Sequence, residues 1–528
     1  MTRLTTSYWP AVSDEPVRET TVGEELRRAA ATWPDGVAQV AGTPDAADRR
    51  TWTFAQLLSD AQRCAAALAA RYAPGDRIAV WAPNIPEWVV LEFGAALAGL
   101  VLVTVNPAYR PSELAYVLNQ SGAVAIFLVP EFRSPMAAYL EEVRADVPGL
   151  RDTYFFTDFD AFLASAPADV TLPVVSPDDV AQIQYTSGTT GFPKGAELHH
   201  RGLVNNALAF ANRLAMTAGE SYVNPMPLFH TAGCAIGVLG TLQTGATHVL
   251  VYAFDPGLVL ELLEAYRAEH LLGVPTMLVA MLEHPTVSTR DLGALRVAVS
   301  GGAPVPADLV RRVEKEMGVT FSIVFGTTEC SPLITQVRLD DAEDDRSGTL
   351  GQPISGVEVK IAHPDTDEPV PVGEVGELCA RGYLVMRGYH DAPEATAAAI
   401  DKDGWYHTGD LGSMDDRGYF RIEGRLKDMI IRGGENIYPR EIEDVLFAHP
   451  AVAEVSVVGL PDPKWGEIVA AFIRLSEGAT PTEKELRDYC REHLAAFKTP
   501  VQWHFVTEFP MTGSGKIQKF KLRESVAG

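Results

Sequence analysis

Two kinds of hydrophobic pattern alternate along the chain. Apolar, alanine-rich stretches with helical spacing are separated by short, continuous apolar runs. The stretches cover 57–72, 258–269 and 305–317, and the runs cover 77–82, 124–129 and 248–253. The first pattern predicts helices and the second predicts buried strands. Their alternation from residue 22 onward predicts an α/β fold with parallel sheets covered by helices.

One apolar segment, residues 88–105, imitates a membrane span, because its 18 residues carry a single charge. Gly99 divides it. Before Gly99 the pattern is typical of a buried helix opened by Pro86, and after it the run LVLVTV is typical of a short buried strand. We therefore expect two elements of a globular core and no membrane span.

The pattern changes near residue 350. Gly-rich, strand-like segments such as VEVKIA and GELCARGY begin there and predict a β-rich subdomain. The C-terminal part returns to mixed helix and strand, after two strand-like segments that meet at a polar turn at 424–428. We expect an N-terminal domain at 1–426, which begins with an extended arm, and a small mobile α+β domain at 427–528.

Composition narrows the classes of function. The chain has 528 residues, too many for one hydrophobic core. Its formal net charge of −25 repels phosphate backbones, which argues against nucleic acid as a partner. The five cysteines are odd in number and form no CxxC pair, so they predict neither a disulfide framework nor a zinc site. Together with an N-terminal segment that lacks the apolar core of a signal peptide, they predict a cytoplasmic protein.

Two polar clusters are expected to be structural. The acidic residues at 340–345 favour a solvated loop over a divalent-cation site. His199 and His200 are adjacent, so their side chains are expected to point apart rather than to share a metal ion.

The segment YTSGTTGFPKG, at 185–195, has the composition of a phosphate-binding loop. Its glycines allow successive backbone amides to turn toward one anion, its hydroxyl groups add donors, and Lys194 adds a positive charge. It differs from a Walker A loop, because Lys194 follows Pro193 and precedes Gly195. On composition alone, an ordinary surface loop remains the alternative.

Six further motifs follow this loop. They are PMPLFHTAG (225–233), SGGAPV (300–305), FGTTE (325–329), GWYHTGD (404–410), GRLKDMIIRGGENIYPREIE (424–443) and PMTGSGKIQKF (510–520). In this order, the motifs make the chain similar to the adenylate-forming superfamily, and most of all to fatty-acyl and medium-chain acyl-CoA synthetases. The resemblance implies a large N-terminal domain of helix-covered sheets with a β-rich subdomain, and a small mobile C-terminal domain.

The resemblance also implies an activity. A carboxylate resists nucleophiles because its charge is delocalised, so these enzymes use ATP and Mg²⁺ to form an acyl adenylate and release pyrophosphate. Transfer to CoA then gives an acyl-CoA thioester. Negative charge must be stabilised at every stage, which explains the concentration of donors and cations in the motifs.

The resemblance assigns site residues by their place in the motifs. Thr328 contacts the α-phosphate, Glu329 binds magnesium, and Asp410 binds the ribose hydroxyl groups with help from Arg425. The phosphate loop contributes Thr186, Ser187, Gly188, Thr189, Thr190 and Lys194. The adenine is lined by Gly302, Ala303 and Pro304.

The same resemblance implies a moving C-terminal domain. Lys516 is the catalytic lysine of adenylation, Lys427 is the hinge, and Gly433 and Gly434 line a pantetheine tunnel that opens after rotation.

The resemblance also implies that His230 lies near the carboxylate of the acid and gates the acyl site. The segment PLFHTAGCAIG contains no Asp for an ammonium group, so an α-amino acid is a disfavoured substrate. The expected pocket lining is Ala232, Gly233, Cys234, Val324, Cys330 and Ser331. Fatty, aryl and cinnamic-type acids all remain open.

Three alternatives remain at this stage. A stand-alone adenylating enzyme would pass its acyl group to an acyl carrier protein, and a similar site would activate another oxyanion such as nitrite. A nucleotide-binding regulator without turnover is the third, and the presence of Lys516, Glu329 and Asp410 together argues against it. A homodimer is also open.

Overall fold

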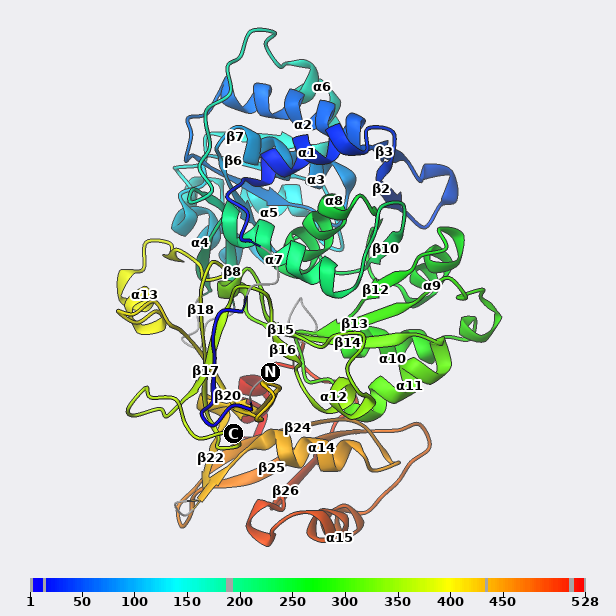
Figure 1. Cartoon of the computed structure of the whole chain (residues 1–528), viewed down its shortest axis with the longest axis vertical. Coiled ribbons are helices and arrows are strands. Elements are labelled where there is room, and N and C mark those ends of the chain that lie inside the picture. Colours follow the sequence, from blue (N-terminus) through cyan, green and yellow to red (C-terminus); the bar gives the residue numbers. More distant parts are fainter. Residues whose placement is uncertain (1–2, 13–15, 187–192, 433–434, 512–516, 527–528) are drawn as a thin grey trace.

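The computed structural model describes residues 3–12, 16–186, 193–432, 435–511 and 517–526. It is an α/β protein, as predicted, in which a large N-terminal part lies above a small C-terminal part (Figure 1). Two mostly parallel sheets and one antiparallel sheet form the large part, and a fourth sheet forms the small one.

The first large sheet has seven strands. In spatial order they are β19 (Gly388–Tyr389), β9 (Lys194–His199), β8 (Val180–Thr186), β5 (Val101–Thr104), β4 (Arg77–Trp81), β6 (Ala125–Leu128) and β7 (Asp152–Phe155). Strands β4 to β8 run parallel, and β8 and β9 form an antiparallel pair around the predicted phosphate loop.

The second large sheet has nine strands. In order they are β16 (Gln352–Pro353), β15 (Leu333–Gln336), β14 (Thr320–Gly326), β13 (Val297–Gly301), β12 (His270–Leu272), β10 (Ser221–Asn224), β11 (Thr247–Val251), β2 (Val37–Gly42) and β3 (Thr51–Thr53). Its six central strands, β14, β13, β12, β10, β11 and β2, run parallel.

Five helical segments fill the space between the two large sheets. They are α1 (Val22–Thr32), α2 (Phe54–Ala69), α3 (Pro86–Leu97), α7 (His200–Arg213) and the π-helical η4 (Ala232–Leu239), with the short α8 (Gly240–Thr244) beside them. Ile78 and Leu250, from one strand of each sheet, belong to this central core. Their neighbours Ala79 and Val249 face the opposite sides. Both faces of the strands are therefore covered, which explains their continuous apolar runs.

The outer faces are covered by separate groups of helices. The seven-stranded sheet carries α4 (Pro111–Ser121) and α5 (Met136–Glu142), and α6 (Phe159–Ala164) packs beside α2. The nine-stranded sheet carries α9 (Pro256–Ala265), α10 (Pro275–Leu282) and α11 (Ala307–Met317).

The segment that imitates a membrane span forms the two predicted elements. Helix α3 begins at Pro86, and all of its residues except Glu87 are buried. Gly99 follows with φ +67°, and strand β5 begins at Val101. Among the described helices, none has both the length and the apolar character needed to cross a bilayer.

The β-rich subdomain is an antiparallel sheet. Its order is β1 (Tyr8–Trp9), β17 (Glu358–Ala362), β18 (Gly376–Arg381), β20 (Tyr406–Met414) and β21 (Phe420–Arg425), with α13 (Pro393–Ala399) in the connection before β20. The N-terminal arm is extended, as expected, but it is an edge strand of this sheet, because Tyr8 pairs with Lys360 and Trp9 is buried.

The expectation of a solvated acidic loop at 340–345 is wrong for two of its residues. Asp341 and Asp345 are buried beside α12 (Glu343–Gly348). Both guanidinium ends of Arg417 donate to Asp345 at 2.8 Å, and the Tyr419 hydroxyl donates to Asp341. These partners lie in the turn between β20 and β21, so Asp341 and Asp345 fix this hairpin by a hydrogen bond and an ion pair, whereas Asp340, Glu343 and Asp344 are exposed as expected.

The C-terminal part has its own hydrophobic clusters. Its sheet is β23 (Glu435–Ile437), β22 (Ile430–Arg432), β25 (Gly466–Leu475) and β24 (Val452–Asp462), with β26 (Gln502–Phe505) on β25. Its helices are α14 (Pro439–Phe447), α15 (Glu483–His493) and α16 (Lys519–Val526). The turn η7 (Leu426–Asp428) joins it to β21 at the predicted boundary, 426/427, which stays a prediction.

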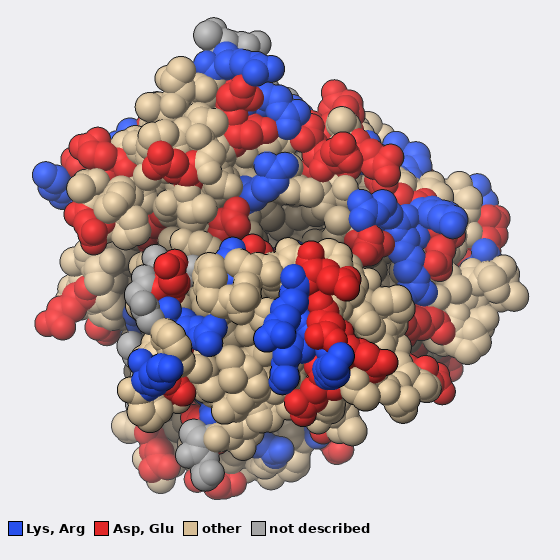
Figure 2. Space-filling model, turned by 90° about the horizontal axis from the view of Figure 1, so that it is seen from below, with Lys and Arg blue, Asp and Glu red and all other residues tan. Residues whose placement is uncertain are grey.

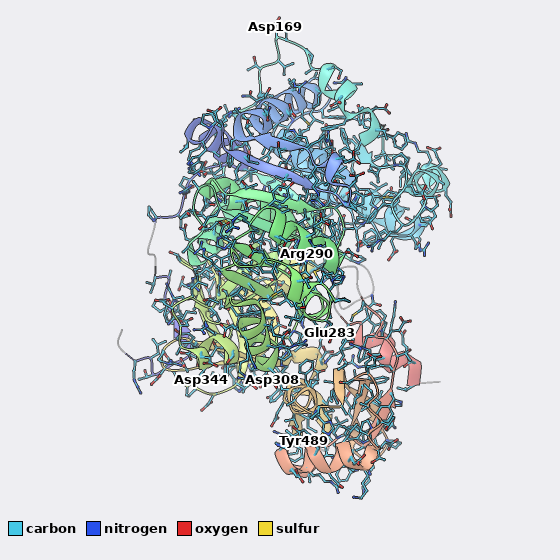
Figure 3. All side chains as sticks on the ribbon, turned by 90° about the vertical axis from the view of Figure 1, so that its right-hand side faces the viewer. Asp169, Glu283, Arg290, Asp308, Asp344 and Tyr489 are labelled. Carbon is cyan, nitrogen blue, oxygen red and sulfur yellow. The ribbon has the colours of Figure 1, made fainter. Side chains whose placement is uncertain are left out.

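Figure 3 shows the small part as a separate body below the large one, with Tyr489 of α15 on it and Glu283 on the facing side of the large part. The pKa of Arg474 of β25 is raised mainly by its hydrogen bond to Glu454 of β24, and the charge of Glu283 acts weakly in the same direction. Seen from below, Lys and Arg are interspersed with Asp and Glu (Figure 2). This mixture differs from the continuous basic surface that nucleic acid requires.

Candidate functional site

Predicted site residues lie beyond strand ends of the two large sheets, and Asp410 and Arg425 lie within the β20–β21 hairpin of the third sheet. Thr186 ends β8 and is the register partner of Lys194, which begins β9. The segment 302–304 follows β13, and Thr328 and Glu329 follow β14. This placement is typical of ligand sites in α/β proteins, which lie beyond the carboxyl ends of parallel strands. Ser187, Gly188, Thr189 and Thr190 lie outside the described residues.

Glu329 is held by a tyrosine that the sequence analysis missed. The Tyr389 hydroxyl donates to Glu329 Oε1 at 2.7 Å, and the Met386 amide donates to the Glu329 carbonyl at 2.7 Å. Lys194 Nζ lies 5.0 Å from the centre of the Tyr389 ring. The structure thus brings the predicted phosphate-loop lysine and the predicted magnesium ligand to two sides of one tyrosine.

Burial and charge keep this tyrosine neutral. Desolvation, followed by the negative charge of Glu329, raises the pKa of Tyr389 above its usual range. The same two causes raise the pKa of Tyr406, the first residue of β20. Both hydroxyl groups therefore remain donors at neutral pH. Tyr406 lies in the motif GWYHTGD, four residues before Asp410, the expected ribose ligand. Its place in this motif could have identified it from the sequence as a residue of the site.

Asp410 and Arg425 form an ion pair across the β20–β21 hairpin. They are register partners, and Arg425 Nε lies 2.8 Å from Asp410 Oδ1. The Asp410 side chain is only 6% exposed, whereas that of Arg425 is 48% exposed. The Asp410 charge raises the pKa of Arg425, and the charges of Asp428 and Glu329 act in the same direction. The ion pair is therefore electrostatically connected to the Glu329 cluster.

The segment after β13 leaves room for a flat ligand. Gly302 has φ +73°, and a Cβ atom added there would meet no atom within 4 Å. At Gly301, by contrast, a Cβ atom would lie 2.3 Å from the Val324 carbonyl oxygen, because β13 and β14 pack closely. Gly302 and Pro304 are exposed and Ala303 is half-buried. The predicted adenine-lining segment is therefore accessible to a ligand, whereas the end of β13 that precedes it is tightly packed.

His230 lies on the loop that joins β10 to η4. Its Nδ1 accepts a hydrogen bond from the Ala232 amide at 3.1 Å, and its carbonyl accepts from the Gly233 amide at 2.8 Å. Asn84 fixes this loop, because its side chain donates to the Met226 carbonyl and accepts from the Leu228 amide. His230 is thus held at the start of the predicted acyl-binding segment.

Five of the six residues predicted to line the acyl pocket are buried, and Ala232 is half-buried. Cys234, Cys330 and Ser331 have no exposed surface. The Gln184 amide donates to Cys234 Sγ at 3.1 Å. A cavity of about 470 Å³ lies beside Asn84 and Tyr252, and none of the predicted pocket residues is in its wall. The acyl-pocket assignment therefore stays a prediction.

The parts predicted to move are described only partly. Lys427 lies in η7 and is exposed, and partial desolvation together with the charge of Arg425 lowers its pKa. Lys516, Gly433 and Gly434 lie outside the described residues. The domain motion is therefore a proposal.

The adjacent histidines point apart, as predicted. His199 Nε2 lies 3.1 Å from the Val385 carbonyl, whereas His200 Nδ1 accepts from the Val22 amide at 3.3 Å. They have separate hydrogen-bond partners in different elements.

Family models match both parts of the chain. The AMP-binding enzyme model matches residues 26–390, and the AMP-binding enzyme C-terminal domain model matches residues 441–516. A Bacillus subtilis protein provisionally named acyl-CoA synthetase YngI is 42% identical, over 96% of each chain. The mitochondrial medium-chain acyl-CoA ligase ACSF2 of Rattus norvegicus is 37% identical, over 98% of this chain and 90% of the relative.

Solved structures agree over nearly the whole chain. The anthranilate CoA ligase AuaEII in complex with anthranoyl-AMP has a TM-score of 0.88 and 28% identity, over 97% of this chain and 98% of that one. ATP-bound MatB from Rhodopseudomonas palustris has a TM-score of 0.86 and 32% identity, over 96% and 99%. With its motifs in order and both family models matched, the chain belongs to the AMP-binding enzyme family.

Proposed function

We propose that this protein activates a carboxylic acid with ATP and transfers the acyl group to CoA. The observation that carries the proposal is the arrangement of Lys194, Tyr389 and Glu329 beside the Asp410–Arg425 pair. A cation beside a neutral donor, together with two buried carboxylates, suits a phosphate chain, a divalent cation and a ribose. Relatives named acyl-CoA synthetase and acyl-CoA ligase, and a neighbour that holds an acyl-AMP, support it.

In the first half-reaction, a carboxylate oxygen of the acid attacks the α-phosphorus of ATP, and pyrophosphate leaves. Negative charge increases on the phosphate oxygens as the new bond forms, so fixed positive charge lowers the barrier. Lys194 and Thr328 supply donors from the strand ends, and we assign Lys516 to the developing charge at the α-phosphate. The Asp410 carboxylate orients the nucleotide through its ribose hydroxyl groups.

Glu329 fits a magnesium ligand. Mg²⁺ binds few protein carboxylates and completes its shell with phosphate oxygens and water. Glu329 is a single buried carboxylate, and Tyr389 holds one of its oxygens. When bound, Mg²⁺ would neutralise the charge of the leaving pyrophosphate.

In the second half-reaction, the CoA thiol attacks the acyl carbon of the adenylate and AMP leaves. We assign this step to a rotated position of the domain 427–528, with Lys427 as the hinge and Gly433 and Gly434 beside the pantetheine chain. The exposure of Lys427 in the short turn between β21 and β22 supports this choice of hinge.

We infer that the acid is a medium-chain fatty acid. Several relatives are named medium-chain acyl-CoA ligase. The segment 227–237 contains no acidic residue, so an ammonium group on the substrate would be buried without a counter-charge.

The test is ATP-dependent pyrophosphate release with a panel of fatty, aryl and amino acids, measured with and without CoA. We expect medium-chain fatty acids to give the largest kcat/KM and CoA to be converted to the thioester in equal amount. Adenylate formation without thioester would favour a carrier-protein acceptor. Release with none of the acids would contradict the proposed function.

A further inference from the structure

The strand that carries Asp410 bulges immediately before this residue. Strands β18 and β20 pair through Cys379 and His407 and again through Glu377 and Leu411. Between these pairs, Leu378 alone lies opposite the three residues 408–410. Gly409, in the middle, has φ +70°. Bulges of this kind redirect a side chain, and here the last residue of the bulge is the predicted ribose ligand.

One carboxylate holds both the middle of this bulge and the residue before it. Glu377 Oε1 accepts a hydrogen bond from the Gly409 amide at 2.9 Å, and Glu377 Oε2 lies 2.9 Å from His407 Nδ1. Thr408 adds a second clamp, because its hydroxyl donates to the Leu378 carbonyl at 2.7 Å and accepts from the Asp410 amide at 3.0 Å. The backbone on both sides of Asp410 is therefore fixed, by Glu377 and Thr408 before it and by its pairing with Arg425 after it.

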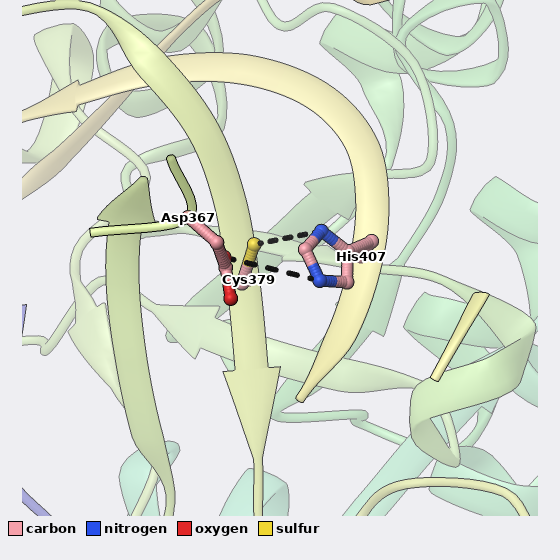
Figure 4. Close-up of side chains that lie close together, drawn as sticks. All are labelled: Asp367, Cys379 and His407. Atoms are coloured by element: carbon pink, nitrogen blue, oxygen red, sulfur yellow. Dashed lines mark hydrogen bonds and ion pairs between the residues drawn. The ribbon is translucent and has the colours of Figure 1, made fainter. Parts of the chain in front are cut away.

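His407 lies among three carboxylates. Besides Glu377, its ring faces Asp367 and Asp401, whose oxygens lie 3.9 Å and 3.8 Å from Nε2. Cys379 Sγ lies 3.5 Å from Nδ1 (Figure 4). The pKa of His407 is raised mainly by its hydrogen bond to Glu377, and the negative charges of Glu377, Asp367 and Asp401 raise it further. A proton on His407 makes Nδ1 a charge-assisted donor to Glu377.

The same cluster has the composition of a metal site, since Asp367, Cys379 and His407 bring three ligand atoms within 4.8 Å of one another. Lys360 argues against that interpretation. Its ammonium group lies 2.7 Å from Asp367 Oδ1 and would repel a second cation. Burial also raises the pKa of the Cys379 thiol, which disfavours the thiolate that a metal ion binds. The cluster is better explained as a network of hydrogen bonds and ion pairs.

We propose that Glu377 and His407 are positioning residues of the nucleotide site, which aim the Asp410 carboxylate at the ribose by holding the bulge at residues 408–410. The inference rests on the proposed function. Neither residue is assigned a contact with the nucleotide. Loss of the clamp should therefore weaken recognition of the ribose hydroxyl groups and leave the phosphate contacts intact.

The test compares binding of AMP and of 2′,3′-dideoxy-AMP to the full-length protein by titration calorimetry. The wild type should bind AMP more tightly, because only AMP carries the two hydroxyl groups. Glu377→Ala should weaken AMP binding by about 10-fold or more and leave dideoxy-AMP binding nearly unchanged. Glu377→Gln, which keeps the side-chain shape and an acceptor for Gly409, should retain much of the discrimination.

A pH series adds a readout that a purely structural role would not change. In the wild type, AMP affinity relative to dideoxy-AMP should fall as pH rises and His407 loses its proton, since Glu377 then loses its charged donor. His407→Gln should remove this dependence. The phosphate of both ligands titrates equally, so their ratio isolates the protein group.

Glu358→Ala is the matched control. Glu358 lies on β17 of the same sheet and is paired with Arg381 at 2.8 Å, away from the bulge. Glu358→Ala should leave the preference for AMP over dideoxy-AMP unchanged. If Asp410→Ala abolishes discrimination and Glu377→Ala, folded by circular dichroism, preserves it, the positioning role is overturned while the proposed function stands. If the wild type itself does not discriminate, the ribose assignment fails first.

Discussion

The hydroxyl group of Tyr389 donates a 2.7 Å hydrogen bond to the carboxylate of Glu329. The two residues come from separate sheets, since Tyr389 is on β19 of the seven-stranded sheet and Glu329 follows β14 of the nine-stranded sheet. Their contact therefore ties the two halves of the large part together at the predicted site. It also fixes the direction of the carboxylate that we assign to magnesium.

Removal of this hydrogen bond should impair adenylation. In Tyr389→Phe the ring that faces Lys194 remains, but Glu329 loses a buried donor. A hydrogen bond to a charged group is worth about 1.5–3 kcal/mol, so we expect roughly a 10- to 100-fold loss in kcat/KM for ATP. Steady-state pyrophosphate release measures it. Tyr383→Phe is the control, because its hydroxyl donates to the Ser355 carbonyl and should matter only for stability.

The contact between Tyr389 and Glu329 also shows where prediction from sequence stops. The helices and strands around the site follow from local periodicity, and α3, β5 and the η7 turn lie where the pattern placed them. Motif order identified Glu329 and Asp410 by resemblance. Tyr389 is 60 residues from Glu329, and it is brought near by long-range contacts, namely the pairing of β19 with β9 and the hydrogen bond from the Met386 amide to the Glu329 carbonyl.

Buried charges were the second feature that the sequence could not reveal. The acidic run at 340–345 has the composition of a solvated loop, and its true partner, Arg417, is 72 residues from Asp345. Likewise, the sequence predicts Glu377 only as part of a strand, because its hydrogen bond to Gly409 depends on a bulge. Strand pairing and bulges arise from long-range contacts, which periodicity does not encode.

Glu329→Gln should weaken Mg²⁺ binding without weakening nucleotide binding. The amide keeps the size of the side chain and an acceptor for Tyr389 but removes the charge that attracts Mg²⁺. We expect the Mg²⁺ concentration needed for half-maximal adenylation to rise several-fold. AMP binding measured without Mg²⁺ should stay near wild type. A parallel loss of both would indicate that Glu329 acts through the fold rather than through the metal.

Stability should fall as the pH decreases from 6.5. Burial lowers the pKa of His248 to about 3 and that of His200 to about 4. Below pH 6.5 the unfolded chain therefore binds protons that these folded histidines reject, which favours unfolding. At pH 5 each contributes a loss of about 2 kcal/mol.

Melting temperatures of wild type and His248→Gln between pH 7.5 and 5 measure this effect. The variant should lose less stability over the range than the wild type does. His363→Gln, at an exposed position, should follow the wild-type slope. Equal slopes for wild type and His248→Gln would rule out a buried neutral His248.

Substrates with an α-ammonium group should be poor. Burial of an unpaired ammonium group costs several kcal/mol, so an α-amino acid should react far more slowly than the acid without its amino group. The comparison of octanoic acid with 2-aminooctanoic acid under identical conditions is the direct measurement. Faster pyrophosphate release with the amino acid would mean that an acidic residue outside 227–237 faces the substrate.

The two half-reactions should be separable by mutation. Lys516→Ala removes an ammonium group that we assign to the α-phosphate only during adenylation, and loss of one such donor typically costs about 10²- to 10³-fold in rate. A synthetic acyl adenylate given to this variant with CoA should still form thioester at nearly the wild-type rate. Lys427→Pro should do the reverse, because the fixed φ of proline restricts rotation at the hinge after the adenylate has formed.

Lys402→Ala is the control for Lys516→Ala, since Lys402 is exposed and lies outside the predicted site. Lys427→Ala, which removes the same side chain without fixing φ, is the control for Lys427→Pro. Rapid-quench measurement of each half-reaction separates the effects. If Lys516→Ala slows both half-reactions equally, the lysine does not leave the site between them. If Lys427→Pro leaves thioester formation unchanged, rotation about this residue is not required. The domain 427–528 would then act from one position throughout, and the boundary at 426/427 would have no functional meaning.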